Sequence, residues 1–311
     1  MKMNQVWKKQ GIDLRPGSQI KGKWHHKTYT IQRKLGAGAI GTVYLCNHGD
    51  RPAALKISDK GTSMTVEVNV LKSLEKVQGS RLGPSLLDVD DWVSPTGNTY
   101  SFYVMEYLQG ETMVGFIRKH GKDWIGVFML QLLEDLEKLH QTGWIFGDLK
   151  TENLLVVSSP PTVRWVDVGG TTKQGRAIKE YTEFYDRGYW GLGSRKAEPS
   201  YDLFAFVMVF LTIYYPNRFE KEHEATEKLL FKKIDHVNDL IPYRSVLKKA
   251  LKSGYASSAE MKRDLIHVLN AAKKREFYHK QKPKTSWKRL FMESGGIGVL
   301  ALMYYLFSLL F

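Results

Sequence analysis

The chain has 311 residues, of which 43% are hydrophobic and 12% aromatic. This apolar content excludes a disordered chain and is enough for the core of a two-lobed domain. The single cysteine, Cys46, excludes a disulfide within the chain and favours a reducing compartment; we interpret it as a small buried residue rather than a nucleophile. The first ten residues, MKMNQVWKKQ, have no apolar run after their charges, so no secretory signal is expected.

The net charge of +14 is concentrated near the two ends of the chain. Residues 1–34 carry nine Lys and Arg against one Asp, and residues 248–289 carry thirteen against three acidic residues, while the body between them is slightly acidic. Basic ends around a nearly neutral body indicate contact with a polyanion, either nucleic acid or anionic lipid. A solvated lysine-rich surface without a ligand is the alternative.

Residues 29–58, YTIQRKLGAGAIGTVYLCNHGDRPAALKIS, alternate apolar and polar positions around glycines, which predicts strands joined by tight turns. Gly36, Gly38 and Gly41, followed by Val43, would let the backbone approach a ligand and donate N–H groups to phosphate. A dinucleotide-binding turn is excluded because the strand-like TVYLC follows, and a Walker A loop because Gly-Lys-Ser/Thr is absent. An ordinary hairpin stays open as an alternative.

Lys56 lies on the last of these strands, among apolar neighbours that would keep its ammonium dry. Residues 65–77 have apolar side chains at a helical period, with Glu67 in the first turns. We therefore expect Glu67 to pair with Lys56, because such a pair holds the α- and β-phosphates of a nucleotide. For Lys56 taken alone, a position on an edge strand facing water is the alternative.

Three further elements are predicted along the body. Residues 99–110 predict a strand that ends in an acidic and aromatic stretch before a glycine. Residues 124–143 are apolar at helical spacing, and Gly143 would end this helix. Residues 201–211, YDLFAFVMVFL, are apolar all round, which predicts a buried central helix.

The stretch WIFGDLKTENLLV, residues 144–156, places Asp148, Lys150 and Asn153 on a loop between a helix and a strand. Asp148 and Asn153 are five positions apart and can face one cavity while their apolar neighbours hold the loop from below. The next predicted strand, TVRWVDVGG, ends in Asp167 before two glycines, where a carboxylate can reach a metal ion held by phosphates.

Residues 294–311, SGGIGVLALMYYLFSLLF, contain no charged side chain. Eighteen residues form a helix of about 27 Å, which reaches across a hydrocarbon core of roughly 30 Å with some snorkelling or thinning. A buried terminal helix that docks on the domain is the alternative. The preceding basic segment should stay cytoplasmic. We therefore predict a single-pass C-terminal tail anchor in the cell membrane, with the body of the chain in the cytoplasm.

The order of these features resembles the Hanks-type protein kinase family over about residues 29–270. Within it, the basic juxtamembrane segment and short anchor look most like the small YabT-type Ser/Thr kinases of spore-forming bacteria, which implies a role in sporulation. The resemblance implies an α+β bilobal fold with a β-rich N-terminal lobe and a mainly helical C-terminal lobe. It divides the chain into a basic extension (1–28), a kinase domain with a shortened C-terminal lobe (29–270), a basic juxtamembrane segment (271–293) and a transmembrane tail anchor (294–311).

The resemblance implies that ATP binds to the N-terminal lobe and its hinge. The implied nucleotide-binding residues are Gly36, Gly38, Gly41, Val43, Lys56, Glu67, Glu106 and Leu108. Lys56 would contact the α- and β-phosphates and pair with Glu67. Met105 would guard the back of the adenine pocket, with the backbone of residues 106–108 as the hinge.

The resemblance also implies the roles of the loop residues. Asp148 would orient the substrate hydroxyl and accept its proton, and Lys150 would stabilise the γ-phosphoryl group. Asn153 and Asp167 would hold Mg²⁺. A lysine two positions after the aspartate is typical of kinases that act on Ser or Thr.

The chain departs from the family pattern at three places. Phe146-Gly147-Asp148 replaces His-Arg-Asp, so the arginine that binds a phosphate on the activation segment is missing. Asp-Val-Gly replaces Asp-Phe-Gly. No Ala-Pro-Glu follows, and the nearest sequence is SRKAEPSYD at 194–202. Within it, Asp202 resembles the family's helix aspartate that braces the catalytic loop. Beyond residue 216 we expect a short lobe.

The activation segment, residues 171–198, holds five hydroxyl groups that could be autophosphorylated: Thr171, Thr172, Tyr181, Thr182 and Ser194. Autophosphorylation in trans would require a homodimer. Because the arginine before Asp148 is missing, ordering of this segment by a phosphate is not expected to follow the family's usual route.

We hypothesise that a polyanion controls the activity through residues 248–289. Lipid binding would use the basic run 273–289 near the membrane, whereas DNA binding would also use basic residues further from it. These are Lys248, Lys249, Lys252, Lys262 and Arg263. Aromatic residues in the same region can stack on bases or lie at a membrane interface. A spacer that only sets orientation is the alternative.

Two functions of different classes are consistent with the sequence. The first is an active Ser/Thr kinase that phosphorylates proteins, since none of the six chemical groups that the family uses is lost. The second is a pseudokinase, a membrane-tethered binding module that keeps the fold, since His-Arg and Ala-Pro-Glu are absent.

Overall fold

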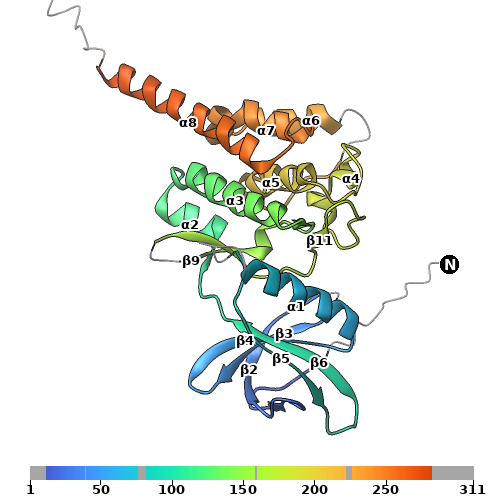
Figure 1. Cartoon of the computed structure of the whole chain (residues 1–311). Helices are drawn as coiled ribbons and strands as arrows, with labels where there is room; N and C mark the ends of the chain where they lie inside the picture. Colours follow the sequence, from blue (N-terminus) through green and yellow to red (C-terminus); the bar gives the residue numbers. More distant parts are fainter. Residues whose placement is uncertain (1–11, 39, 76–81, 158–159, 222–225, 282–311) are drawn as a thin grey trace, which may run out of the picture. The chain divides into compact units, whose positions relative to one another are not determined.

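The computed structural model describes residues 12–38, 40–75, 82–157, 160–221 and 226–281, with only the backbone for 272–281. The chain divides into two units, residues 1–266 and 267–311. The first unit contains a strand-rich lobe followed along the chain by a helical lobe (Figure 1). This α+β arrangement of two lobes is the one predicted from the sequence.

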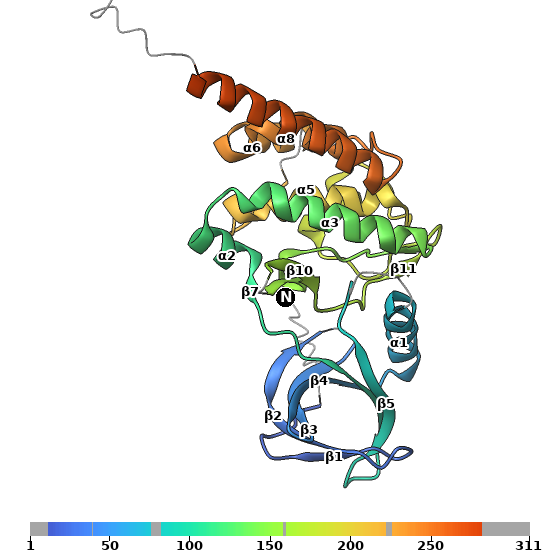
Figure 2. The same cartoon turned by 60° about the vertical axis from the view of Figure 1, so that its left-hand side comes forward.

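The N-terminal lobe is built on a six-stranded antiparallel sheet with strand order β1-β2-β3-β4-β6-β5. Its strands are β1 (Gln19–Lys21), β2 (Thr28–Ala37), β3 (Thr42–His48), β4 (Arg51–Ser58), β5 (Leu86–Val93) and β6 (Thr99–Glu106). The sheet curls strongly, as Figure 2 shows. Because Ile20 of β1 pairs with Tyr29 of β2, the lobe takes in part of the segment 1–28 that was expected to lie outside it.

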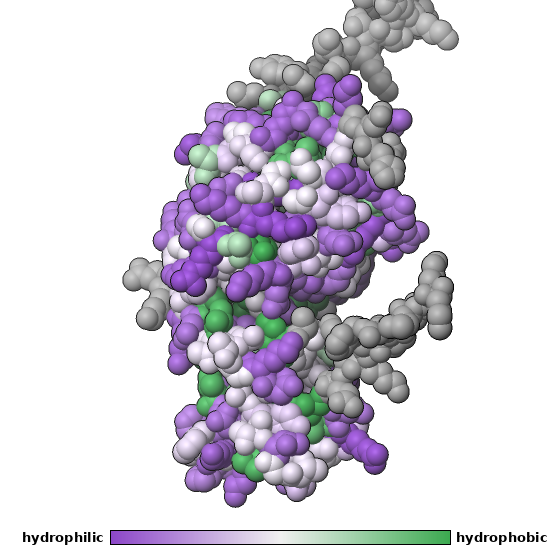
Figure 3. Space-filling view, turned by 90° about the vertical axis from the view of Figure 1, so that its right-hand side faces the viewer, coloured by the Kyte–Doolittle hydropathy of each residue, from purple (hydrophilic) through white to green (hydrophobic). Residues whose placement is uncertain are grey.

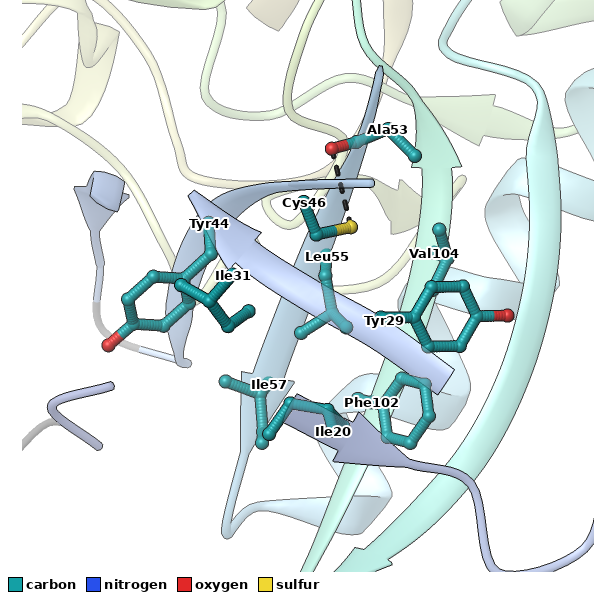
Figure 4. Packing of buried hydrophobic residues seen from close by; sticks show 10 residues of the cluster. All are labelled: Ile20, Tyr29, Ile31, Tyr44, Cys46, Ala53, Leu55, Ile57, Phe102 and Val104. Carbon is teal, nitrogen blue, oxygen red and sulfur yellow. Dashed lines mark hydrogen bonds between the residues drawn. The ribbon is translucent and has the colours of Figure 1, made fainter. Parts of the chain in front are cut away.

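The inner face of this sheet holds a core of ten buried residues, drawn in Figure 4. Tyr29, Phe102 and the aliphatic side chains of β4 pack together there, since alternate residues of each strand point to the same face. Cys46 belongs to this core, and its thiol donates to the carbonyl oxygen of Ala53 at 3.4 Å. Burial raises the pKa of Cys46 to about 12, so its prediction as a buried residue rather than a nucleophile is confirmed.

Helix α1 (Gly61–Glu75) packs against β5 and β6. It begins four residues before the predicted start at 65. Val70, Leu71 and Leu74 are buried at helical spacing, which fixes the face that α1 turns to the sheet, and Glu67 is buried with them. A buried carboxylate at this place requires a partner, which the site provides.

The chain enters the helical lobe through residues 107–110. There follow β7 (Glu111–Thr112), α2 (Met113–His120), α3 (Trp124–Gln141), β8 (Trp144–Ile145), η1 (Thr151–Asn153), β9 (Leu154–Val157), β10 (Thr162–Trp165) and β11 (Thr172–Lys173). The short strands form two small sheets, β10-β9-β7 and β11-β8. Gly143, predicted to end the second helix, follows α3 with a φ of 78°.

The rest of the described chain is mainly helical. Its elements are η2 (Glu183–Tyr185), α4 (Arg187–Trp190), α5 (Pro199–Tyr214), α6 (Thr226–Asp235), η3 (Asn238–Tyr243), α7 (Arg244–Leu251) and α8 (Ser258–Gln281). Helix α5 starts with Pro199 at its first position and has 13 buried residues of 16, which confirms the predicted buried helix. It contacts α3, α4 and α7.

Among the described residues, no helix is long and apolar enough to cross a membrane. The predicted anchor, residues 294–311, lies outside the described part of the chain, as do most of the residues of the juxtamembrane segment. On the face of the molecule shown in Figure 3, hydrophilic residues prevail and the hydrophobic ones form small separate patches.

Candidate active site

Lys56 joins three elements of the fold through two ion pairs. Its Nζ lies 2.7 Å from Oε2 of Glu67 on α1 and 3.4 Å from Oδ1 of Asp167, which follows β10. The phenol of Tyr103 on β6 donates to the same Glu67 oxygen at 2.7 Å. The ion pair between Lys56 and Glu67 that the sequence predicted is therefore formed, and Tyr103 orients its carboxylate.

The pKa directions of these three groups follow from burial and charge. Burial alone would lower the pKa of Lys56, but the carboxylates of Asp167 and Glu67 outweigh it and raise the pKa. Burial would raise the pKa of Asp167, but Lys56 and the N–H of Gly169 lower it. For Glu67 burial prevails and raises the pKa, and its Oε1 has no hydrogen-bond partner among the described residues. At neutral pH, Lys56 is therefore charged and Asp167 is ionised.

The glycines between β2 and β3 leave the backbone open on one side. Gly36 pairs with Val43 across the two strands, and the N–H of Gly38 donates to the carbonyl of Gly41 at 2.9 Å. Apart from the chain neighbours, no atom of the described residues lies within 4 Å of the place where a Cβ would stand on Gly36 or Gly38. At Gly41 a Cβ would overlap the carbonyl oxygen of Ile57. The loop is thus held tightly at Gly41 and offers open backbone at the other two glycines.

The connection between the lobes starts at the end of β6, where Met105 is buried. The N–H of Glu106 donates to the carbonyl of Ser85 at 2.8 Å, and its carboxylate pairs with Arg164 at 3.1 Å. Leu108 lies partly buried in the segment that leads to β7. The side chain of Glu106 therefore fixes the hinge to the second lobe, a contact that sequence reasoning did not predict.

Asp148 and Lys150 meet a third residue, Thr182, that sequence reasoning considered only as a modification site. The Thr182 hydroxyl donates to Oδ1 of Asp148 at 2.9 Å, and Lys150 Nζ donates to the Thr182 oxygen at 3.3 Å. Lys150 also pairs directly with Asp148 Oδ2. One carboxylate, one ammonium and one hydroxyl thus converge at the start of η1, with Asp148 and Lys150 both partly exposed.

Asn153 and Asp167 form the side of the site that fits a metal ion. The side-chain amide of Asn153 donates to the backbone carbonyl of Asp148 at 2.9 Å, and the backbone carbonyl of Asn153 accepts from the N–H of Val166 at 3.0 Å. The side chain of Asp167 is 48% exposed. No cluster of three or more metal-ligating side chains occurs within the described residues. A carboxylate plus an amide oxygen suits Mg²⁺, which takes few protein ligands and completes its shell with phosphates and water.

Gly147, the residue that replaces the family's arginine, has a φ of 79°. A Cβ on it would lie 2.5 Å from the carbonyl oxygen of Gly170. A side chain at this position is therefore excluded by both backbone conformation and space. Conversely, a Cβ on Gly170 would lie 2.6 Å from Cβ of Asp148.

Asp202, in the first turn of α5, accepts hydrogen bonds from the backbone of the loop that carries Asp148. The family's helix aspartate, which Asp202 resembles, implied this role. The carboxylate of Asp202, which is fully buried, accepts from the N–H of Phe146 at 2.7 Å and from that of Gly147 at 2.9 Å. Nε2 of His140, at the end of α3, lies 2.8 Å from the same carboxylate, and Nδ1 lies 3.2 Å from the hydroxyl of Ser258 on α8. Asp202 is therefore a structural brace.

Comparisons with known proteins agree with this geometry. A family model described as the protein kinase domain matches residues 29–277. The chain belongs to the protein kinase family. The serine/threonine-protein kinase YabT of Bacillus subtilis (strain 168) is 47% identical over 289 residues, which cover 92% of this chain and 85% of that protein. The resemblance to YabT-type kinases stated from the sequence is confirmed.

Two further matches extend the family assignment. The sporulation protein kinase mde3 of Schizosaccharomyces pombe is 27% identical over 222 residues, covering 62% of this chain and 39% of that protein. The crystal structure of a kinase domain superposes with a TM-score of 0.61 at 16% identity, covering 81% of this chain and 97% of that one. The second match supports the bilobal kinase fold.

Most of the hydroxyl groups in the activation segment are buried or contact other parts of the kinase. Thr171 is buried and Thr172 donates to the carbonyl of Gly170 at 3.1 Å, while Tyr181 is exposed against the guanidinium of Arg195. Thr182 is engaged with Asp148, so of the five hydroxyl groups it is the one that lies in the site itself. Asp186 and Arg187, which the sequence did not single out, form ion pairs with Arg195 and Glu198 in the stretch nearest to the absent Ala-Pro-Glu.

Four of the basic residues predicted to contact a polyanion are engaged in ion pairs with neighbouring helices. The pairs are Lys248–Asp235 at 2.7 Å, Lys249–Asp264 at 3.1 Å, Lys252–Glu227 at 3.1 Å and Lys262–Glu134 at 2.9 Å. Arg263 is exposed and has no ion pair within the described part of the chain. The side chains of the basic run 273–289 lie outside the described residues.

Proposed function

We propose that this kinase transfers the γ-phosphoryl group of ATP to serine and threonine hydroxyls of proteins. The observation that carries the proposal is the convergence of Asp148, Lys150 and Thr182 in one site. The Lys56–Glu67 pair, held together with Asp167, supports it, because phosphoryl transfer depends on positioning and charge neutralisation.

In this proposal Asp148 accepts the proton of the substrate hydroxyl as the oxygen–phosphorus bond forms and the bond between the β–γ bridging oxygen and the γ-phosphorus breaks. The carboxylate is partly exposed, and its Oδ1 accepts from Thr182. The substrate hydroxyl would donate to the exposed part of this carboxylate, while Thr182 stays hydrogen-bonded to Oδ1. Lys150 lies beside the carboxylate and neutralises charge that develops on the transferred group.

Nucleotide binding is assigned to the residues whose geometry suits phosphate and base. Lys56 is charged and buried, and the open backbone at Gly36 and Gly38 can approach phosphate oxygens. The end of β6 and residues 106–108 offer backbone groups to an adenine. Bound Mg²⁺ would neutralise the phosphate charge, and Asp167 and Asn153 are the residues that would hold it.

Several finer features are part of the proposal. Autophosphorylation in trans requires a homodimer, and residues 294–311 would tether the kinase to the cell membrane with its kinase domain in the cytoplasm. The basic region would bind DNA or anionic lipid. Because four of its lysines are already paired, the binding is assigned mainly to residues 273–289.

The test uses the full chain in detergent with labelled ATP and dephosphorylated casein. Wild type should transfer phosphate, and Asp148→Asn should reduce kcat by about 10²–10⁴, the range for loss of a general base. Asp235→Asn, a surface acid with the same chemical change, should match wild type. ATP binding without transfer in any sample would identify a pseudokinase.

A second assay addresses the polyanion. Binding of naked duplex DNA or of anionic vesicles would be measured against salt concentration, since each released counterion steepens the dependence. Replacing Lys280, Lys282 and Lys284 by Gln should weaken binding and flatten the salt slope. The same change at Lys248, Lys249 and Lys252 should have little effect. Equal effects of the two triple variants would contradict the assignment to the juxtamembrane run.

A further inference from the structure

The segment Ser194–Ser200, named here the anchor segment, lies against residues 175–178, near the start of the activation segment, in a strand-like pairing. The N–H of Gly175 donates to the carbonyl of Ala197 at 2.7 Å, and the N–H of Ala197 donates back to Arg176 at 2.7 Å. Further along, the N–H of Ile178 donates to the carbonyl of Arg195 at 2.8 Å. These three bonds hold residues 175–178 in place by backbone alone, without any phosphorylated side chain.

Arg187, at the start of α4, donates a hydrogen bond from each of its three guanidinium nitrogens to the anchor segment. Nε donates to the carbonyl of Ser194, Nη1 to the hydroxyl of Ser200 and Nη2 to Oε1 of Glu198, each at 2.7 Å. The side chain is 2% exposed. A buried arginine must have such partners, and here all of them come from a single stretch of seven residues. The pKa of the Glu198 carboxylate is lowered, and the hydrogen bond from Arg187 is the largest cause.

Asp186 makes a second set of contacts to the same stretch. Its buried carboxylate accepts from the N–H groups of Gly188 and Tyr189, at 3.0 and 2.9 Å, and thereby caps α4. It also accepts from Nε of Arg195 at 2.8 Å and from the phenol of Tyr201 at 2.9 Å. Two consecutive residues, of opposite charge, thus bind the anchor segment through two ion pairs.

A short stretch of chain, residues 182–186, connects Asp186 and Arg187 to the reacting groups. Thr182, which donates to Asp148, is followed by η2 and then by Asp186. The N–H of Tyr185 donates to the carbonyl of Thr182 at 2.9 Å, so this stretch is a rigid turn. The position of Thr182 beside Asp148 therefore depends on where Asp186 and Arg187 are fixed.

We propose that Arg187 is a positioning residue which locks the substrate-facing turn 182–190 onto the anchor segment, so that the kinase needs no phosphate on its activation segment. The proposal rests on the proposed function, because it concerns how the same site is ordered. It explains how the chain works without Ala-Pro-Glu and with a glycine at position 147. The lock is internal to residues 175–200 and uses three backbone bonds and two ion pairs, each of which has one buried partner, Arg187 or Asp186.

The first experiment measures steady-state kinetics of full-length Arg187→Gln with ATP and dephosphorylated casein, and its Kd for Mg-ATP. Because the lock holds the protein-facing turn and not the nucleotide residues, KM for casein should rise about tenfold or more while the Kd for Mg-ATP stays within about twofold. Lys196→Gln, an exposed cation of the same anchor segment, is the matched control and should behave as wild type. A purely structural role for Arg187 predicts equal losses for ATP and casein, and that result would overturn the proposal.

Glu198→Gln and Ser200→Ala keep the test valid if Arg187→Gln does not fold. Each removes one of the three partners of the guanidinium, so each should raise KM for casein by a smaller factor, about threefold, again without a change in Mg-ATP affinity. If both folded variants bind casein as wild type does, the proposal fails.

The second experiment removes the other hydroxyl groups of the activation segment at once, as Thr171→Val, Thr172→Val, Tyr181→Phe and Ser194→Ala. The quadruple variant should keep kcat and KM within about twofold of wild type. A loss of activity that a phosphomimetic Glu at any of these positions restores would overturn the proposal. Wild type that binds Mg-ATP but transfers nothing would instead refute the proposed function, so the two failures are distinguishable.

Discussion

Gly147 lies so close to the carbonyl oxygen of Gly170 that position 147 has no room for a side chain. A Cβ on Gly147 would lie 2.5 Å from the carbonyl oxygen of Gly170, and the φ of Gly147 is 79°. The missing arginine before Asp148 is therefore more than a lost charge. The loop follows a backbone path on which an arginine would be strained and in collision with the segment after Asp167.

Replacing Gly147 by Ala should lower both kcat and thermal stability. The positive φ costs about 1–2 kcal/mol for a residue with a Cβ, and the overlap with Gly170 forces the loop away from Asp167. The measurement is kcat together with Tm. Gly97→Ala is the control, because Gly97 has a φ of 84° but no atom within 4 Å of its missing Cβ. Similar losses in both variants would show that the close approach has no effect of its own.

Removing the Thr182 hydroxyl should slow phosphoryl transfer without affecting nucleotide binding. Thr182→Val leaves Asp148 and Lys150 each without one charge-assisted hydrogen bond, which is worth about 1.5–3 kcal/mol and corresponds to a drop in kcat of about tenfold to a hundredfold. Thr182→Ser retains the hydroxyl and should keep most of the activity. The readouts are kcat and the Kd for Mg-ATP. A Val variant as fast as the Ser variant would exclude this role.

Asp202→Asn should destabilise the helical lobe and disturb the catalytic loop together. The amide has one acceptor oxygen, so one of the N–H groups of Phe146 and Gly147 loses a charge-assisted bond, at a cost of about 1.5–3 kcal/mol. Unfolding in urea gives the free energy and the kinase assay gives kcat. Asp235→Asn changes an ion pair whose carboxylate is largely exposed, and should cost less than about 1 kcal/mol.

The free energy of unfolding of the N-terminal lobe should decrease at low pH, partly because Asp90 becomes protonated. Burial would raise the pKa of Asp90, but backbone N–H groups of His25, Trp24 and Asp91 outweigh it and lower the pKa below that of the unfolded chain. A lowered folded pKa means that the stabilisation is complete above about pH 4 and is lost as the pH falls through the folded value.

Asp90→Asn should accordingly be less stable than wild type by about 1.5–3 kcal/mol at pH 7, with the difference shrinking below pH 4. Urea unfolding at pH 7, 5 and 3 measures it. Asp50→Asn, at an exposed turn, is the control and should be about as stable as wild type at pH 7. A gap that widens in acid would contradict the sign of the shift.

The sequence predicted which polar residues of the candidate site the fold brings together, since these stand in short motifs in a fixed order. Lys56, Glu67, Asp148 and Asp167 come together as expected, even though 111 positions separate the two ends of the Lys56–Asp167 contact. The order of the motifs along the chain and the family that this order resembles were enough to predict these contacts. The two lobes were predicted from the same resemblance, and the buried helix α5 from a run that is apolar on all sides.

The supports of the site were not predictable, since they join residues without a recurring spacing. Arg187 finds three partners in the anchor segment, and His140 connects Asp202 with Ser258 of α8. Nothing in a linear pattern distinguishes these side chains from exposed polar ones. Similarly, the lysines from 248 to 262 read as one basic patch, whereas tertiary packing places acidic partners beside four of them.

The burial of α5 on every side has a consequence for how fast the backbone N–H groups of the site exchange with solvent. Amide hydrogens in a helix with 13 buried residues of 16 exchange with solvent only when the whole lobe opens. Asp202 belongs to this helix and holds the N–H groups of Phe146 and Gly147. In a hydrogen-exchange experiment the buried N–H groups of Phe146 and Gly147 would therefore exchange as slowly as those in the core of the lobe.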